Sequence, residues 1–152
     1  MGLNARDLAL KYLSRRDRTA MEIKKYLELK GVSEEEIRDC LDYLSECGLI
    51  DDEEYCEKYI SYGMEKGRGP IRLEKELLER GVSPEVVKLA LEAHFSDGAE
   101  QKAALAYINK LLEQTGREIA GNDKEMAKIG RRLAYQGYHS NVIYDLLNKL
   151  RR

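Results

Sequence analysis

The sequence predicts an all-α fold of three tandem three-helix repeats, and three observations lead to it. The chain of 152 residues contains only 2 Pro, the residue that most disfavours a helix interior. Helix-capping patterns recur along its whole length. One apolar pattern also returns around three glycines. We expect right-handed, helix-turn-helix-like modules in an elongated, curved arrangement, because such short units need neighbours to cover their apolar faces.

Three sequence signals mark where the helices begin and end. A Ser, Thr, Asp or Asn followed three residues later by Glu satisfies two backbone amides that have no partner inside a helix. Proline suits the first helical position, where no amide hydrogen is needed. Glycine just past an apolar-periodic run adopts the left-handed conformation that ends a helix.

Residues 1–50 are the first predicted repeat. Its helices are expected at about 4–15, 19–30 and 33–47. Its capping pairs are Thr19 with Glu22 and Ser33 with Glu36. Its terminating glycines are Gly31 and Gly48.

Residues 51–96 are the second predicted repeat. Its helices are expected at about 51–66, 69–80 and 83–95. Their starts carry Asp51 with Glu54, Gly69 before Pro70, and Ser83 before Pro84. The terminating glycines are Gly67 and Gly81.

Residues 97–152 are the third predicted repeat. Its helices are expected at about 97–115, 122–136 and 140–150. The capping pairs are Asp97 with Glu100 and Asn122 with Glu125. The terminating glycines are Gly116 and Gly137.

The repeats become visible when the chain is aligned on Gly31, Gly81 and Gly137. Apolar side chains stand eight and four residues before each glycine, and one, six and ten residues after it. They are Ile23, Leu73 and Ile129; Leu27, Leu77 and Leu133; Val32, Val82 and Tyr138; Ile37, Val87 and Ile143; Leu41, Leu91 and Leu147. The glycines lie 50 and 56 residues apart, and the extra six residues fall in the polar stretch 114–123. Such a row of modules offers a large binding surface and no catalytic cleft.

Composition restricts the class of protein. The longest uninterrupted apolar stretch, 103–108, is far shorter than the roughly 20 residues of a membrane span. Residues 1–13 include Asp7 and Lys11 and have no apolar core of a secretory signal. We expect a cytoplasmic protein that does not enter a membrane.

Neither metal nor cofactor chemistry is indicated. The three cysteines have no CxxC spacing, and only two histidines could join them as ligands. Cys40 and Cys47 stand seven residues apart on one expected helix, where both can face a core. The acidic run 51–54 complements a helix dipole. Gly67, Arg68 and Gly69 lack the strand and spacing of a phosphate-binding loop. We expect no metal, no cofactor and no enzymatic activity.

Charge is distributed unevenly along the chain. The net charges of residues 1–50, 51–100 and 101–152 are minus 1, minus 6 and plus 5. On the eighth expected helix the basic residues lie on one stripe, away from the apolar stripe of that helix. The candidate partner- or DNA-binding residues at this end of the chain are Lys124, Lys128, Arg131, Arg132, Lys149, Arg151 and Arg152. A second basic cluster contains Lys11, Arg15, Arg16 and Arg18. Such clusters neutralise phosphates or meet an acidic protein face.

Each pair of helices around a glycine could also be a helix-turn-helix reader of DNA. In the first two repeats, residues 34–36 and Glu85 would point carboxylates at phosphates. The third repeat offers Ser140, Asn141 and Tyr144 beside basic neighbours. A sequence-specific DNA-binding protein therefore stays an alternative, as does a general helical-repeat adaptor for another protein.

Three stretches of the chain, 48–60, 66–82 and 131–143, together resemble the pattern of the bacterial regulatory RecX family. The residues that carry the motif are Asp51, Asp52, Gly67, Arg68, Gly69 and Arg72. The resemblance covers nearly the whole chain in order. Two departures are Tyr55 and Cys56, where the family commonly has Phe and Ala.

The resemblance implies three tandem three-helix repeats that bind the recombinase RecA. It implies that the protein lodges in the groove of the RecA filament on single-stranded DNA and inhibits recombinase, ATPase and coprotease activity. These activities belong to DNA repair, recombination and the SOS response. Because the net charge is minus 2, we expect direct DNA binding to be weak and protein contact to supply most of the affinity. We expect a monomer.

Overall fold

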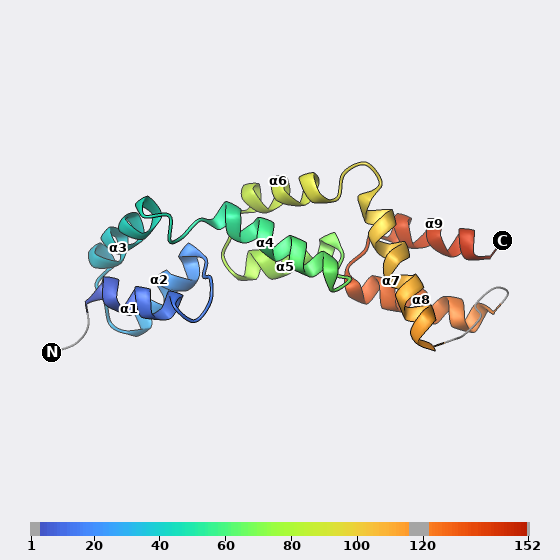
Figure 1. The fold of residues 1–152 in the computed structure, drawn as a ribbon, viewed down its shortest axis with the longest axis horizontal. Coiled ribbons are helices and arrows are strands. Elements are labelled where there is room, and N and C mark those ends of the chain that lie inside the picture. The colour runs from blue at the N-terminus through green and yellow to red at the C-terminus, as the bar shows by residue number, and fades with distance from the viewer. Residues whose placement is uncertain (1–3, 116–121, 152) are drawn as a thin grey trace. The chain divides into compact units, whose positions relative to one another are not determined.

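The computed structural model describes residues 4–115 and 122–151, and in these residues all regular structure is helical (Figure 1). The helices are α1 (Ala5–Leu13), α2 (Ala20–Leu29), α3 (Glu34–Glu46), α4 (Asp52–Glu65), α5 (Pro70–Glu79), α6 (Pro84–His94), α7 (Ala99–Thr115), α8 (Asp123–Gln136) and α9 (Ser140–Leu150). Each lies within about two residues of its predicted bounds. The all-α fold class is confirmed.

The chain divides into two compact units. The first contains Met1–Lys58 with Leu77–Val87, and the second contains Tyr59–Glu76 with Lys88–Arg152. In the first unit α1, α2 and α3 pack against one another in pairs, as Figure 1 shows at the amino-terminal end. Their core contains Ala5, Ala9, Ile23, Leu27, Ile37, Cys40, Leu44 and Ile50.

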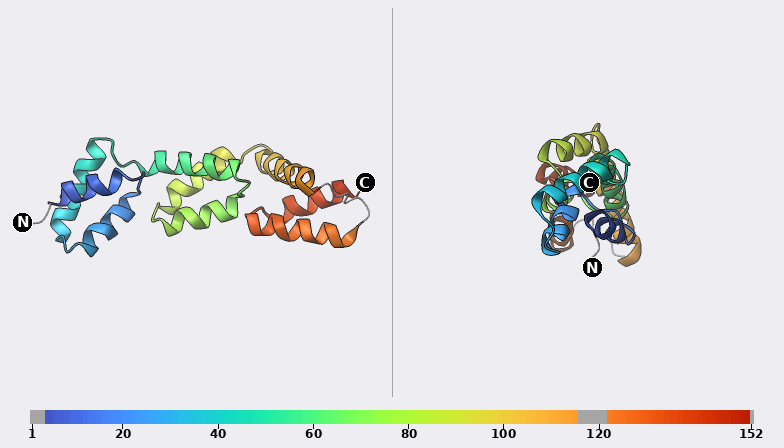
Figure 2. Two further views of the ribbon diagram at one scale, coloured as in Figure 1. Left: turned by 60° about the horizontal axis from the view of Figure 1, so that its bottom comes forward. Right: turned by 90° about the vertical axis from the view of Figure 1, so that its left-hand side faces the viewer.

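In the second unit α9 packs against both α7 and α8. Figure 2 shows α8 and α9 side by side in its left-hand view. The core between them contains Ala104, Ile108, Met126, Ile129, Leu133, Tyr138, Val142 and Leu146. Buried side chains from all three helices therefore surround one centre.

The apolar positions that define the sequence repeat all lie in the interior. Eleven of the fifteen are buried, and the other four, Val32, Leu41, Ile143 and Leu147, are partly buried. Since none is exposed, the threefold pattern reports the packing faces of the helices.

Most of the predicted caps are formed. Thr19 and Glu22 make the complete reciprocal cap at the start of α2. The side chains of Ser33 and Asn122 accept hydrogen bonds from the amides three residues later. The carboxylate of Asp51 accepts from the amides of residues 53 and 54. These local contacts explain why the starts of the helices could be predicted closely.

The predicted capping pair of Asp97 with Glu100 is wrong. Asp97 has a φ of 53° and α7 begins at Ala99. The Glu100 carboxylate instead accepts a hydrogen bond of 2.8 Å from the amide of His139 at the start of α9. A tertiary contact has replaced a local one, because Glu100 faces the interior of its unit.

Glycines end the helices as expected. Gly31, Gly48, Gly67, Gly81 and Gly137 all have positive φ. Gly98 also has a positive φ, which was not predicted. Gly116 lies outside the described residues.

The cysteines correct one expectation. Cys40 and Cys56 are buried, and Cys47 is exposed, because Cys47 is the residue that caps the end of α3. Burial raises the pKa of the Cys56 thiol to about 11. In the described part of the chain no helix is long and apolar enough to cross a bilayer, and no three His, Cys, Asp or Glu side chains gather as metal ligands.

Candidate partner-binding surface

The basic residues of α8 form an exposed stripe. Lys124, Lys128 and Arg131 are all exposed, whereas Met126 and Ile129 are buried in the core of the unit. Spacings of four and three residues place the three cations on one face of the helix. The predicted orientation of this stripe is therefore seen, and its role in binding stays a prediction.

Neighbouring groups hold part of this basic surface in place. Lys128 Nζ lies 3.6 Å from Glu125 Oε1. Arg132 Nε donates to the Tyr107 hydroxyl over 3.3 Å. Exposed ion pairs contribute little to stability, so Lys128 can exchange Glu125 for another anion at small cost.

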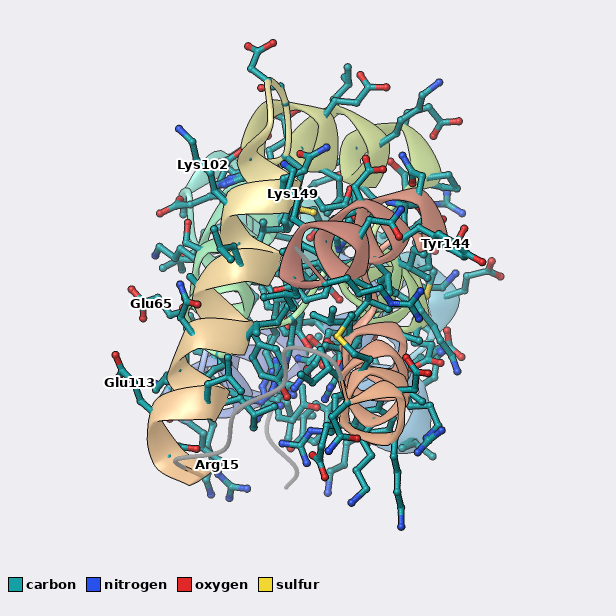
Figure 3. All side chains as sticks on the ribbon, turned by 90° about the vertical axis from the view of Figure 1, so that its right-hand side faces the viewer. Arg15, Glu65, Lys102, Glu113, Tyr144 and Lys149 are labelled. Carbon is teal, nitrogen blue, oxygen red and sulfur yellow. The ribbon has the colours of Figure 1, made fainter. Side chains whose placement is uncertain are left out.

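The carboxyl-terminal candidates are also at the surface. Lys149 and Arg151 are exposed, and Arg151 Nη2 lies 3.6 Å from Asp123 Oδ1. This pair connects the end of α9 to the start of α8. Figure 3 shows Lys149 and Tyr144 projecting from α9. Arg152 lies outside the described residues.

The amino-terminal basic cluster is partly engaged within its own unit. Lys11 and Arg15 are exposed. Arg16 Nη2 lies 3.0 Å from Glu22 Oε2, and the Arg18 guanidinium lies 3.8 Å from the centroid of the Tyr12 ring. Lys11 and Arg15 are thus the members most accessible to a partner, and the other two help to order the loop between α1 and α2.

A contact that we call the first joint connects the start of α2 to the end of α5 within the first unit. Thr19 Oγ1 donates a hydrogen bond of 2.6 Å to the Arg80 carbonyl, and Thr19 is fully buried. The amide of Ala20 donates to Asp52 Oδ1 over 3.0 Å. Burial raises the pKa of the Asp52 carboxyl, although the bond from Ala20 opposes the shift.

The second joint lies within the second unit and connects the start of α5 to the end of α8. The amide of Gly69 donates to the Gln136 carbonyl over 2.7 Å, and the amide of Ile71 donates to the Gly137 carbonyl over 2.9 Å. The Tyr138 hydroxyl donates to the Gly67 carbonyl over 2.9 Å. The hydroxyl also fixes Tyr138 beside the loop before α5.

The two joints use equivalent positions of the repeat. Thr19 and Gly69 each stand twelve residues before their repeat glycine, and Arg80 and Gln136 each stand one residue before theirs. In both joints, the residue that precedes the second helix of one repeat contacts the carboxyl end of the second helix of the next repeat. One rule of contact therefore occurs twice.

These contacts place most family-motif residues at the joints. Asp52 belongs to the first joint, and Gly67, Gly69 and Arg72 belong to the second. Arg72 Nη1 donates to Gln136 Oε1 over 3.0 Å. The other two motif residues serve local roles: Asp51 caps α4, and Arg68 lies 3.8 Å from Glu76.

Basic side chains also recur at fixed positions of the repeat. Lys25, Lys75 and Arg131 each stand six residues before a repeat glycine, and all three are exposed. Arg18, Arg68 and Lys124 each stand thirteen residues before one. Alignment on the glycines could have found this recurrence, because it needs only the printed sequence.

A groove on the second unit adds further cations. It has a volume of about 330 Å³ and contains Lys66, Lys110 and Arg132 around Tyr107 and Leu111. Glu65 also lines the groove, so three cations stand against one carboxylate. Together with the apolar side chains, this lining can hold an anionic group that has an apolar body. Lys66 and Lys110 were not among the residues predicted for the site.

Comparison with known proteins gives two matching family models. The model described as RecX, first three-helix domain, matches residues 5–44. The model described as RecX, second three-helix domain, matches residues 51–91. The first range contains α1, α2 and most of α3, and the second contains α4, α5 and most of α6.

Whole-chain relatives and a solved structure agree with this match. A protein of Pseudomonas fluorescens named Regulatory protein RecX is 34% identical over 147 residues, covering 94% of this chain and 89% of the relative. One of Ectopseudomonas mendocina with the same name is 35% identical over 149 residues, covering 95% and 93%. The crystal structure of RecX from Lactobacillus salivarius shares the fold, with a TM-score of 0.81, 22% identity and coverage of 96% and 94%.

Proposed function

This chain belongs to the RecX family of regulatory proteins, and from that membership we propose that it is a non-enzymatic regulator that binds the recombinase RecA. In this proposal it occupies the groove of the RecA filament on single-stranded DNA and inhibits recombinase, ATPase and coprotease activity. It thereby modulates DNA repair, recombination and the SOS response. We propose that it acts in the cytoplasm as a monomer without a cofactor.

The proposed architecture has repeats at residues 1–50, 51–96 and 97–152. It is supported by the equivalence of the two joints, each of which connects residues that we assign to successive repeats. A repeated protein that uses one joint rule presents equivalent side chains at regular intervals. That property suits a partner that is itself a polymer of identical subunits.

The recurring exposed cations carry this proposal. Lys25, Lys75 and Arg131 occupy one position of the repeat and are all exposed. A filament presents the same acidic or phosphate groups once per subunit, so cations at a fixed repeat position can meet successive subunits. Bridging adjacent RecA subunits in this way would block subunit addition or promote disassembly.

Charge at the two ends provides steering and anchoring. The stripe on α8 with Arg132, Lys149 and Arg151 is our first choice of binding residues, and Arg152 joins it as a prediction outside the described residues. Lys11, Arg15 and Arg16 are the second choice. Clustered exposed charge raises association rates with an oppositely charged partner, and we expect inhibition to weaken as salt is added.

The test is charge reversal on the α8 stripe. We expect Lys128→Glu with Arg131→Glu to weaken inhibition of RecA-dependent ATP hydrolysis by roughly tenfold or more, because both steering and contact are lost. The measurement is the inhibitor concentration that halves the ATPase rate, with circular dichroism to verify unchanged helical content.

A matched control changes the net charge equally at other exposed sites. Lys88→Glu with Lys102→Glu alters exposed lysines on α6 and α7, and Figure 3 shows Lys102 at the surface of α7. We expect this variant to inhibit nearly as well as the native chain. Unaltered inhibition by the stripe variant would remove the stripe from the mechanism.

A second candidate function is sequence-specific duplex binding through α9. Ser140, Asn141 and Tyr144 are all exposed at the start of this helix, which is the part that a recognition helix presents to bases. This function predicts tight binding to a selected duplex without RecA. A gel shift that compares selected with random duplexes discriminates it from the first proposal.

A further inference from the structure

A row of aromatic and basic side chains lies beside the second joint. We call it the aromatic-cation strip and define it as Tyr62, Lys66, Arg68, Arg72, Glu76 and Tyr135. These residues come from α4, the loop after it, α5 and α8. All belong to the second unit.

At one end of the strip two cations accompany Tyr62. Lys66 Nζ lies 5.5 Å and Arg68 Cζ lies 5.7 Å from the centroid of the Tyr62 ring. Both distances are within the range of a cation–π interaction. Tyr62 is still 51% exposed, so the cations leave much of the ring open to solvent.

At the other end Tyr135 has a similar neighbour. Arg72 Cζ lies 5.4 Å from the centroid of the Tyr135 ring, and Tyr135 is 75% exposed. Arg72 Nη1 is held by Gln136 Oε1 at 3.0 Å. The guanidinium is thus fixed beside a ring that has little contact with its own protein.

Glu76 connects the two ends. Its Oε1 lies 3.8 Å from Arg68 Nη1, and its Oε2 lies 3.5 Å from Arg72 Nε. Three cations and one carboxylate give the strip a net charge of plus 2. Glu76 also restrains both arginine side chains, which lowers the entropy that they lose when a ligand binds.

We propose that the aromatic-cation strip binds a single strand of nucleic acid, with an unpaired base stacked on each tyrosine and phosphates beside the cations. Exposed aromatic rings next to a positive groove are the usual means of binding single strands without sequence preference, because every base has a π-face. A duplex keeps its bases stacked on one another and cannot use the rings. The choice of DNA over RNA rests on the proposed function.

The recurrence of one pair supports this assignment. Tyr12 and Arg18 stand fifty residues before Tyr62 and Arg68, and in the first unit Arg18 lies over Tyr12 as Arg68 lies over Tyr62. In the first unit, however, Tyr26 stacks on Tyr12 at 4.0 Å. The position of Tyr26 corresponds to Glu76, so only the second pair has an open aromatic surface.

The experiment measures binding of a fluorescent 20-nucleotide oligo-dT by anisotropy at low salt without RecA. We expect Tyr62→Ala with Tyr135→Ala to weaken binding by about fivefold to about a hundredfold for each ring. Tyr62→Phe with Tyr135→Phe should retain binding, because stacking needs no hydroxyl. Lys66→Ala should reduce the slope of the logarithm of the binding constant against the logarithm of the salt concentration by the value of about one phosphate contact.

Leu89→Ala on α6 is the matched control, since Leu89 is 68% exposed, lies in the second unit and is outside the strip. We expect this variant to bind oligo-dT like the native chain. Circular dichroism and urea unfolding establish that each variant is folded.

Three results would overturn the proposal. The first is that the alanine pair binds oligo-dT as tightly as the native chain, or that the native chain does not bind oligo-dT at all. The second is equal affinity for oligo-dT and a 20-base-pair duplex. The third is tighter binding of oligo-rU, which would reject DNA as the ligand. RecA-dependent ATPase inhibition by the same variants tests the proposed function separately, because filament docking can survive loss of the strip.

Discussion

The repeat glycines share a backbone conformation but have different surroundings. Gly31, Gly81 and Gly137 have φ values of 79°, 88° and 99°. A methyl group on Gly31 would meet no atom within 4 Å, whereas one on Gly81 would overlap the Met21 side chain. A methyl group on Gly137 would lie 2.5 Å from the backbone nitrogen of Arg72. Of these three glycines, only Gly81 and Gly137, which lie at the joints, are needed both for the positive φ and for the close approach of a neighbouring helix.

Alanine substitution should separate these two requirements. Gly31→Ala should cost about 1 to 2 kcal/mol of unfolding free energy, from the left-handed conformation alone. Gly137→Ala should cost at least about 3 kcal/mol, because the methyl group also displaces the backbone of α5. Urea unfolding followed by circular dichroism measures both. Equal losses in the two variants would show that the second joint does not require the close approach.

The hydroxyl of Thr19 serves α2 and the first joint together. It accepts from the Glu22 amide and donates to the Arg80 carbonyl. Thr19→Val keeps the shape but removes both the cap and the hydrogen bond to the Arg80 carbonyl, so we expect a loss of about 2 to 4 kcal/mol. Thr19→Ser keeps both bonds and should lose about 1 kcal/mol or less. Thermal and urea unfolding compare the two variants, and a loss in Thr19→Val no larger than that in Thr19→Ser would contradict the role given to the hydroxyl.

At the scale of the helices, Tyr138 connects the loop between α8 and α9 to the loop before α5. Burial raises the pKa of the Tyr138 hydroxyl to about 12, with smaller contributions from Tyr107 and Glu100. The neutral phenol is therefore favoured in the folded chain relative to the unfolded chain, whose tyrosines titrate near pH 10. This contribution to stability is present below about pH 10 and is lost as the pH rises towards about 12.

Tyr138→Phe tests that contact. At pH 8 the variant should lose about 1 to 2 kcal/mol, because the Gly67 carbonyl loses its partner. Above about pH 10 the difference between native and variant should shrink, since only the native chain ionises at this position. Urea unfolding across pH 8 to about 11 measures the difference. A difference that grows with pH would contradict the assigned burial of the neutral hydroxyl.

The helices could be predicted because their signals are local. Thr19 caps α2 through a residue three positions away, and the buried face of α8 follows its helical period. The joints could not be predicted in the same way. Thr19 and Arg80 are separated by 61 residues. Glu100 accepts a hydrogen bond from the amide of His139, 39 residues away, and does not form the local cap that the sequence predicted. Such contacts depend on how the helices pack against one another, and local patterns in the sequence do not indicate that packing.

The candidate site was predictable to a different degree. The exposure of Lys124 and Lys128 follows from the amphipathic pattern of α8. That Arg72 contacts Gln136 and Tyr135 does not follow from any local pattern. The motif residues were singled out by family resemblance, and the structure shows that most of them also hold two neighbouring helices together.

Across the whole molecule, charge and repetition fit one mode of action. The middle segment carries minus 6 and the last carries plus 5, so the chain can contact both basic and acidic groups of a partner. Exposed cations return at spacings of 50 and 56 residues. Exposed cations that return at fixed repeat positions suit docking on a polymer of identical subunits.

Co-sedimentation with RecA filaments on single-stranded DNA tests this account most directly. We predict that the chain pellets with filaments, saturates at a fixed ratio to RecA and is released as salt increases. DNA alone, with and without nucleotide, controls for pelleting without RecA. A chain that stays in the supernatant at low salt while filaments pellet would contradict the account.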